Sequence, residues 1–216
     1  YDAAEKALLR AAEKAPDDAE INVALGELYE KKKQHLKAAQ YYEKALKGMP
    51  NNLEVLLNVS NSYQRADRPQ DALAVLVKNQ KHFYTSKEVT REIGLLEFEM
   101  RDTASARKHL EASVSLSPPD GRVFLYLGDI YAAAKETEKA IKMYERAEGL
   151  VEEKLAPRAA LAKLYLRKDE PDKARVYLGK VLAAKASYPK ANLMMAEVLY
   201  EKQQYKEASK YYLNKR

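Results

Sequence analysis

Side chains that often do chemistry are sparse in this chain and do not cluster along the sequence. No second metal ligand stands three or four residues from His35, His82 or His109, so these histidines predict no metal-binding helix face. Cysteine is absent, which excludes thiolate catalysis, thiolate zinc sites and disulfides. Carboxylate pairs such as Glu152 and Glu153 fall on ordinary polar helix faces, and no phosphate loop, catalytic triad or zinc-protease motif occurs. We therefore expect no metal, no cofactor and no enzymatic activity.

The elements that would position any site repeat with a period of 34 residues. Small residues recur at this spacing, each of them 12 residues before an alanine, at Gly26, Ser60, Gly94, Gly128, Ala162 and Ala196. A fixed period in this range is typical of stacked repeats, which bury a continuous core between neighbours, and not of one globular core.

Each repeat is expected to be a pair of helices. In the repeat that begins at Ala19, the residues Ile21 and Leu25 lie on one apolar helix face, and a second apolar stripe follows after a short break. Pro50 lacks an amide hydrogen and disfavours helix at the residue before it, which ends the second helix. The pattern therefore predicts a helical hairpin.

Small residues have a steric role in this hairpin. Gly26 and Ala38 carry little bulk where the two helix backbones approach each other. Tyr29 and Tyr42 fill the space beside them, as the close packing of protein interiors requires.

These residues resemble the tetratricopeptide repeat (TPR), whose pattern is Leu-Gly, then Tyr, Ala, an aromatic residue, Ala and a closing Pro. The first full repeat matches the pattern throughout, at Leu25, Gly26, Tyr29, Ala38, Tyr42, Ala45 and Pro50. Other repeats depart from it in places, and Glu97 stands where the family has Tyr. The resemblance covers the whole chain. It implies an all-α, right-handed α-solenoid of stacked antiparallel helical hairpins, with about 13 helices.

The period divides the chain into a single solenoid, 1–216. Residues 1–18 hold the second helix of a truncated repeat, and full repeats follow at 19–52, 53–86, 87–120, 121–154 and 155–188. The last repeat, 189–216, stops inside its second helix. We therefore expect a fragment of a longer array. The absence of cysteine fits a periplasmic or other extracytoplasmic location, but it is equally compatible with the cytoplasm.

Charge gives only a weak indication of partners. The formal net charge is +6, with 18 basic and 17 acidic side chains in residues 1–108 and 20 and 15 in residues 109–216. This imbalance slightly favours an acidic partner toward the C-terminal half, while the simpler interpretation is a solvated helix surface. No run approaches the roughly 20 apolar residues that a membrane span needs.

The resemblance implies that first helices line a concave face and second helices a convex one. A partner would then contact outward positions of the first helices: Asn58, Asn61, Gln64, Arg65, Arg91, Leu95, Phe98, Arg122, Leu125, Tyr126, Asp129 and Lys163. Amide side chains both donate and accept hydrogen bonds, so Asn58 and Asn61 could pair with the backbone of an extended peptide. Leu95, Phe98 and the Leu125–Tyr126 pair would form an apolar floor beside them. The alternative is that these residues pack against neighbouring first helices.

One known use of the family is not expected here. TPR proteins that grip the acidic tails of heat-shock chaperones use Lys, Asn, Asn, Lys and Arg on three consecutive first helices. The corresponding residues are Val23, Glu27, Asn58, Glu88 and Glu92, of which only Asn58 matches. The carboxylates would repel an acidic tail.

The leading hypothesis is therefore a non-enzymatic scaffold that binds a peptide or helix of another protein in its concave groove. The second is a self-assembling structural spacer, a homo-oligomer in which exposed end helices stack on a neighbour. RNA binding is the third and the least favoured, because no residue position recurs as a base-reading code and Lys31, Lys32 and Lys33 lie at a turn. We expect no small-molecule substrate.

Overall fold

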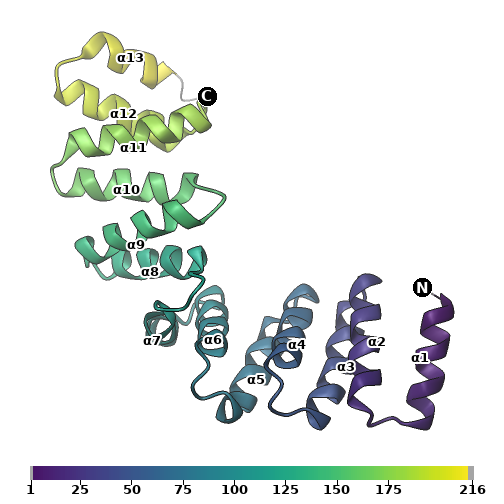
Figure 1. The fold of residues 1–216 in the computed structure, drawn as a ribbon. Coiled ribbons are helices and arrows are strands. Elements are labelled where there is room, and N and C mark those ends of the chain that lie inside the picture. The colour runs from purple at the N-terminus through teal and green to yellow at the C-terminus, as the bar shows by residue number, and fades with distance from the viewer. Residues whose placement is uncertain (1, 214–216) are drawn as a thin grey trace. The chain divides into compact units, whose positions relative to one another are not determined.

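The structure is a computed structural model that describes residues 2–213, and it is all-α over that range (Figure 1). Helix α1 (Asp2–Lys14) precedes six helical hairpins. These are α2 (Ala19–Lys31) with α3 (His35–Gly48), α4 (Leu53–Arg65) with α5 (Pro69–Asn79), α6 (Lys87–Glu99) with α7 (Thr103–Ser113), α8 (Gly121–Ala133) with α9 (Thr137–Leu150), α10 (Leu155–Arg167) with α11 (Pro171–Ala184), and α12 (Pro189–Glu201) with α13 (Tyr205–Leu213). The expected fold class is confirmed.

The chain divides into two compact units, residues 1–113 and 114–216. The first unit contains α1 to α7 and a short 3-10 helix, Gln80–His82, after α5; the second contains α8 to α13. Within each unit, the two helices of a hairpin pack together and consecutive hairpins pack in chain order. A single continuous array over the whole chain stays a prediction.

Most first helices begin with a side chain that caps the backbone. Asp18, Asn52 and Ser86 each accept a hydrogen bond from the amide three residues later, at 3.0, 3.1 and 3.2 Å, and Asp120 accepts from the amide of the second residue after it at 2.9 Å. Such caps satisfy amides that have no partner inside the helix. Lys154 precedes α10 in the same phase and makes no such bond. The same is true of the residue that precedes α12.

The turn inside every hairpin has one backbone conformation. Its second residue has a positive φ, between 57° and 71°, at Lys33, Asp67, Arg101, Lys135, Asp169 and Gln203. In the first turn the amide of Gln34 donates to the carbonyl of Tyr29 at 2.9 Å, and the amide of Lys33 donates to that of Glu30 at 2.9 Å. This pair of bonds ends a helix with a left-handed residue, usually glycine. None of the six residues is glycine, so the sequence did not reveal the left-handed conformation of these turns.

Close approach of the two helices depends on a matched pair of residues. A Cβ atom added to Gly26 would lie 2.6 Å from Cε1 of Tyr42, and one added to Gly128 would lie 2.7 Å from Cδ1 of Tyr144. The steric role expected for Gly26 is therefore confirmed. Where Ser60 or Ala162 replaces the glycine, the residue in the phase of Tyr42 is the narrower leucine, at Leu76 and Leu178. There are two exceptions: Gly94 faces Leu110, and Ala196 shares its repeat with Tyr212 in the phase of Tyr42.

The departure from the family pattern at Glu97 also has a partner. Glu97 is buried on α6, and Nδ1 of His109 on α7 lies 2.6 Å from its carboxylate. The same two phases hold Tyr29 and Tyr41 in the first full repeat, where the rings stack with centroids 5.4 Å apart. A polar pair therefore replaces an aromatic pair at the same place in the hairpin.

Candidate functional site

An exposed stripe on α4 carries the two asparagines that the sequence analysis singled out. Asn61 is exposed and Asn58 is partly exposed, whereas Leu56, Val59 and Tyr63 on the opposite side of the helix are buried. Helical periodicity separates the two sides, because residues three and four apart share a face. Neither asparagine side chain has a hydrogen-bond partner within residues 2–213, so both amides are available to a ligand.

A carboxylate on the preceding repeat fixes the end of this stripe. Glu30 on α2 accepts hydrogen bonds from the Ser62 hydroxyl at 2.6 Å and from Nη1 of Arg65 at 2.8 Å, and Nδ1 of His35 lies 3.0 Å from it. Burial by itself raises the pKa of Glu30, but the bonds from Ser62 and Arg65 together with His35 outweigh burial and leave that pKa below its ordinary value. Glu30 therefore stays ionised and braces α4 against α2.

The brace changes the interpretation of Arg65. Its side chain is exposed, as expected, but its guanidinium is already paired with Glu30. Sequence analysis missed both Glu30 and Ser62 as partners. The sequence did contain a signal for this pair. Glu30 and Arg65 carry opposite charges at the C-terminal ends of consecutive first helices, and Arg65 lies one residue past the position equivalent to Glu30 in the next repeat.

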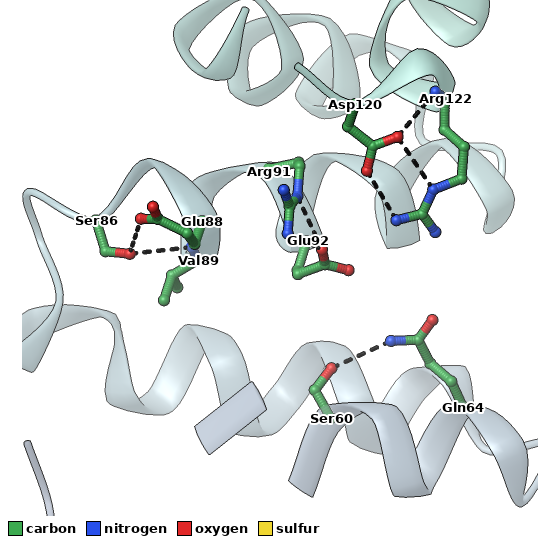
Figure 2. A network of polar contacts seen from close by, with 9 residues as sticks. All are labelled: Ser60, Gln64, Ser86, Glu88, Val89, Arg91, Glu92, Asp120 and Arg122. Carbon is green, nitrogen blue, oxygen red and sulfur yellow. Dashed lines mark hydrogen bonds and ion pairs between the residues drawn. The ribbon is translucent and has the colours of Figure 1, made fainter. Parts of the chain in front are cut away.

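Two further polar residues of the first unit bond within their own helices (Figure 2). Gln64 donates from Nε2 to the Ser60 hydroxyl at 3.3 Å, and Arg91 contacts the carboxylate of Glu92 at 2.9 Å. A ligand that used Gln64 or Arg91 would have to replace these contacts.

The apolar floor needs one correction. Leu95 on α6 is buried, with 2% of its surface exposed, so it is a core residue and not an open contact for a partner. It was assigned outward because its phase matches Asn61, but the surface around α6 is more closed than that around α4. Phe98 is partly buried.

The remaining predicted residues lie in the second unit. Arg122 on α8 is held by Asp120, whose two carboxylate oxygens contact its guanidinium at 2.9 and 3.3 Å (Figure 2). Leu125 and Tyr126 are partly buried, and Lys163 on α10 is exposed. A floor that combines these residues with Phe98 stays a prediction.

Asp129 is turned toward its own hairpin. The hydroxyl of Tyr144 on α9 donates to its carboxylate at 2.6 Å. Although Asp129 as a residue has exposed surface, burial around the carboxylate raises its pKa by more than the Tyr144 hydrogen bond lowers it. This carboxylate therefore supports the α8–α9 hairpin, and a contact between Asp129 and a partner stays a prediction.

Two kinds of site can be assessed over residues 2–213 as a whole. In that range no group of three or more His, Asp or Glu side chains lies close enough together to hold a metal ion. None of the helices described is both long and apolar enough to cross a bilayer.

Comparisons with known proteins agree with the helical repeat fold. A family model described as tetratricopeptide repeat matches residues 1–52 and 91–156, and a second model with that description matches residues 165–213. A comparison with curated proteins gives no match.

Solved structures are also similar to this chain. A crystal structure of MamA protein has a TM-score of 0.66 at 27% identity, covering 79% of this chain and 94% of that one. MamA 41-end from Desulfovibrio magneticus RS-1 has a TM-score of 0.66 at 22% identity, with coverages of 79% and 96%. YrrB, titled a TPR protein with an unusual peptide-binding site, has a TM-score of 0.69 at 17% identity, with coverages of 87% and 97%. The last two show the fold alone. Because the first family model matches more than half of its residues, this chain belongs to the tetratricopeptide repeat family.

Proposed function

We propose that this protein is a non-enzymatic scaffold that binds an extended peptide segment of a partner protein along the exposed faces of its first helices. TPR proteins bind other proteins or peptides, and the observation that carries the proposal here is the pair of open amides, Asn58 and Asn61, on a braced helix. An extended segment has unpaired backbone amides and carbonyls, and each asparagine can donate to one and accept from the other. Because Glu30 fixes α4 beforehand, little freedom is lost on binding.

The test is a capture experiment followed by a binding measurement with a defined peptide. Wild type, the double variant Asn58→Ala with Asn61→Ala, and a control with Asn51→Ala and Gln70→Ala would be used as baits in host lysate. The control removes two surface amides from other parts of the first unit. A segment of a captured protein, located by cross-linking and synthesised, is expected to bind wild type and the control equally and the Asn58/Asn61 variant at least about tenfold more weakly. Equal binding to all three proteins would rule out the α4 stripe as the site.

Self-association is a second candidate, and exposed apolar residues on the last hairpin favour it. Tyr200, Tyr205 and Leu213 are 58%, 55% and 79% exposed, and the rings of Tyr200 and Tyr205 meet edge to face with centroids 5.0 Å apart. Exposed apolar surface of this kind often marks an interface. Light scattering during size-exclusion chromatography should then show a mass that rises with concentration, and Tyr205→Glu with Leu213→Glu should remove that rise. A constant monomeric mass for wild type would exclude this function.

A further inference from the structure

A groove that the proposed function does not use lies between the second helices α3 and α5 of the first unit. It encloses about 840 Å³, and its exposed rim carries four lysines, Lys37, Lys44, Lys47 and Lys78. The floor includes the buried side chains of Leu46 and Val75 together with Tyr29 and Tyr41. It therefore combines an apolar floor with a cationic edge.

The tyrosines and two of the lysines form an ordered stack. The rings of Tyr29 and Tyr41 are 5.4 Å apart and nearly parallel, with an angle of 8° between their planes. Nζ of Lys37 lies 5.2 Å from the centroid of Tyr29, and Nζ of Lys44 lies 4.9 Å from that of Tyr41. Contacts of this kind hold the ammonium groups in place without neutralising them. On the far side, the Tyr29 hydroxyl donates to Glu5 on α1 at 2.8 Å.

The groove is strongly unbalanced in charge. Glu43 is the only carboxylate among its lining residues, and that carboxylate already accepts a hydrogen bond from the Tyr63 hydroxyl at 2.9 Å. Asp71, one turn before Val75 on α5, is paired with Arg68. Lys47 and Lys78 have no ion-pair partner within the described chain. Four positive charges around one engaged carboxylate attract a negatively charged ligand.

We propose that the α3–α5 groove is a second binding site, which takes an extended acidic peptide segment of a partner protein. Lys37 and Lys44 are seven residues apart on one helix, about 10.5 Å along its axis. A peptide in the extended polyproline II conformation has three residues per turn and rises about 3.1 Å per residue, so carboxylates three residues apart lie on one face, about 9.3 Å apart, and would match this spacing. Aliphatic residues between them would face Leu46 and Val75. The amides of Gln40 and Asn79, which also line the groove, could bond to the peptide backbone.

The same geometry disfavours single-stranded nucleic acid. Bases bind proteins mainly by stacking on open aromatic faces, but the two tyrosines here stack on each other and a lysine ammonium lies over each ring. The groove also contains no arginine, the residue best suited to hold phosphate with two parallel hydrogen bonds.

The second unit contains a natural comparison. Tyr165 and Tyr177 stack at 5.7 Å, with Lys173 and Lys180 over them at 5.2 and 4.7 Å, so the stack recurs four repeats later. There, however, Ala183 occupies the phase of Lys47, and Lys180 is also 3.3 Å from Glu148. The stack alone is therefore a recurrent packing feature, and the additional lysines are what distinguish the α3–α5 groove.

The experiment uses the full chain and defined probes. Fluorescence anisotropy would measure binding of a labelled peptide with Glu at every third position and Leu or Val between, of its Gln-for-Glu counterpart, and of an oligouridylate of equal charge. One variant replaces three groove lysines, Lys44→Gln, Lys47→Gln and Lys78→Gln. A control of equal charge replaces exposed lysines elsewhere, Lys108→Gln, Lys142→Gln and Lys206→Gln. A smaller variant, Lys47→Gln with Lys78→Gln, leaves the aromatic stack intact if the triple variant fails to fold.

The acidic peptide is expected to bind wild type, and its affinity should fall as the salt concentration rises. Its affinity should be about tenfold or more lower for either groove variant but less than about twofold lower for the control. The Gln peptide should not bind. The proposal is overturned if the acidic peptide fails to bind wild type, or if groove and control variants lose affinity equally. It is also overturned if the oligouridylate binds more tightly and is lost in the groove variants, because the groove would then be a nucleic-acid site. None of these results depends on Asn58 or Asn61, so this proposal and the proposed function can fail separately.

Discussion

At the scale of single residues, the Glu30 carboxylate joins two repeats through Ser62 and Arg65. Ser62 is 1% exposed, so Glu30→Ala would leave its hydroxyl buried without its acceptor. We expect the free energy of unfolding to fall by about 1–3 kcal/mol, the usual effect of leaving a buried polar group unpaired. Chemical denaturation at neutral pH measures this. Glu27→Ala, an exposed position on the same helix, is the control and should change stability by less than about 0.5 kcal/mol.

The same carboxylate makes stability depend on pH. Its pKa in the folded protein is below the ordinary value of a glutamate, so its stabilising contribution is complete above that ordinary value and is lost as pH falls through the folded pKa. Wild type and Glu30→Gln should therefore differ in unfolding free energy at pH 7 and converge as the pH falls through the lowered pKa of Glu30. A difference that stays constant across this range would show that the charge of Glu30 is not what stabilises the brace.

At the scale of elements, the approach of two helices depends on the pair formed by Gly26 and Tyr42. A methyl group on residue 26 would overlap the Tyr42 ring, so Gly26→Ala should cost about 1–3 kcal/mol through overpacking. Tyr42→Leu reproduces the combination found with Ala162 and Leu178, and in that background Gly26→Ala should cost much less. A double-mutant cycle measures the coupling. If the effects of the two substitutions on the free energy of unfolding are additive, the Tyr42 ring is not the reason that residue 26 is glycine.

The missing cap of α10 allows a test of how helix capping affects the stability of the second unit. Lys154 precedes α10 in the phase at which Asn52 caps α4, and it makes no capping bond. Lys154→Asp should supply the missing acceptor and a favourable charge at the helix N-terminus, raising stability by about 1 kcal/mol. Lys154→Ala separates the cap from the mere loss of a lysine. A thermal midpoint that rises equally in both variants would exclude capping as the cause.

For the molecule as a whole, the sequence predicted those structural features that depend on the size and polarity of single residues. The small residues at the phase of Gly26 indicated the hairpin and its period because steric exclusion acts locally. The brace at Glu30 was not predicted, since it joins side chains 32 and 35 residues away and depends on rotamers as well as phase. Leu95 was placed outward by phase alone, but exposure depends on how closely neighbouring helices cover a position. The turns inside the hairpins were predicted, but their left-handed conformation was not, because non-glycine residues occupy all six positions.

The distribution of stability along the chain follows from the caps. In a repeat protein, stability is close to a sum of contributions from each repeat and its neighbours, so a repeat without a cap should open more often. Helices α4 and α10 each lie in the middle hairpin of their own unit, but only in α4 does the N-cap residue, Asn52, bond to the third amide after it. In α10 the one side-chain bond to the N-terminal amides is that of Glu153 with the amide of Leu155 at 2.8 Å. Amide hydrogens of α10 should therefore exchange about fivefold faster than those of α4, the factor that corresponds to about 1 kcal/mol.

Two variants make this comparison internal to the protein. Lys154→Asp should slow exchange in α10 and leave α4 unchanged, whereas Asn52→Ala should accelerate exchange in α4 and leave α10 unchanged. Hydrogen exchange followed by mass spectrometry resolves peptides from the two helices in one experiment. A change that spread equally over both helices would mean that the repeats open as one cooperative unit, and stability would then have to be treated as a property of the entire chain.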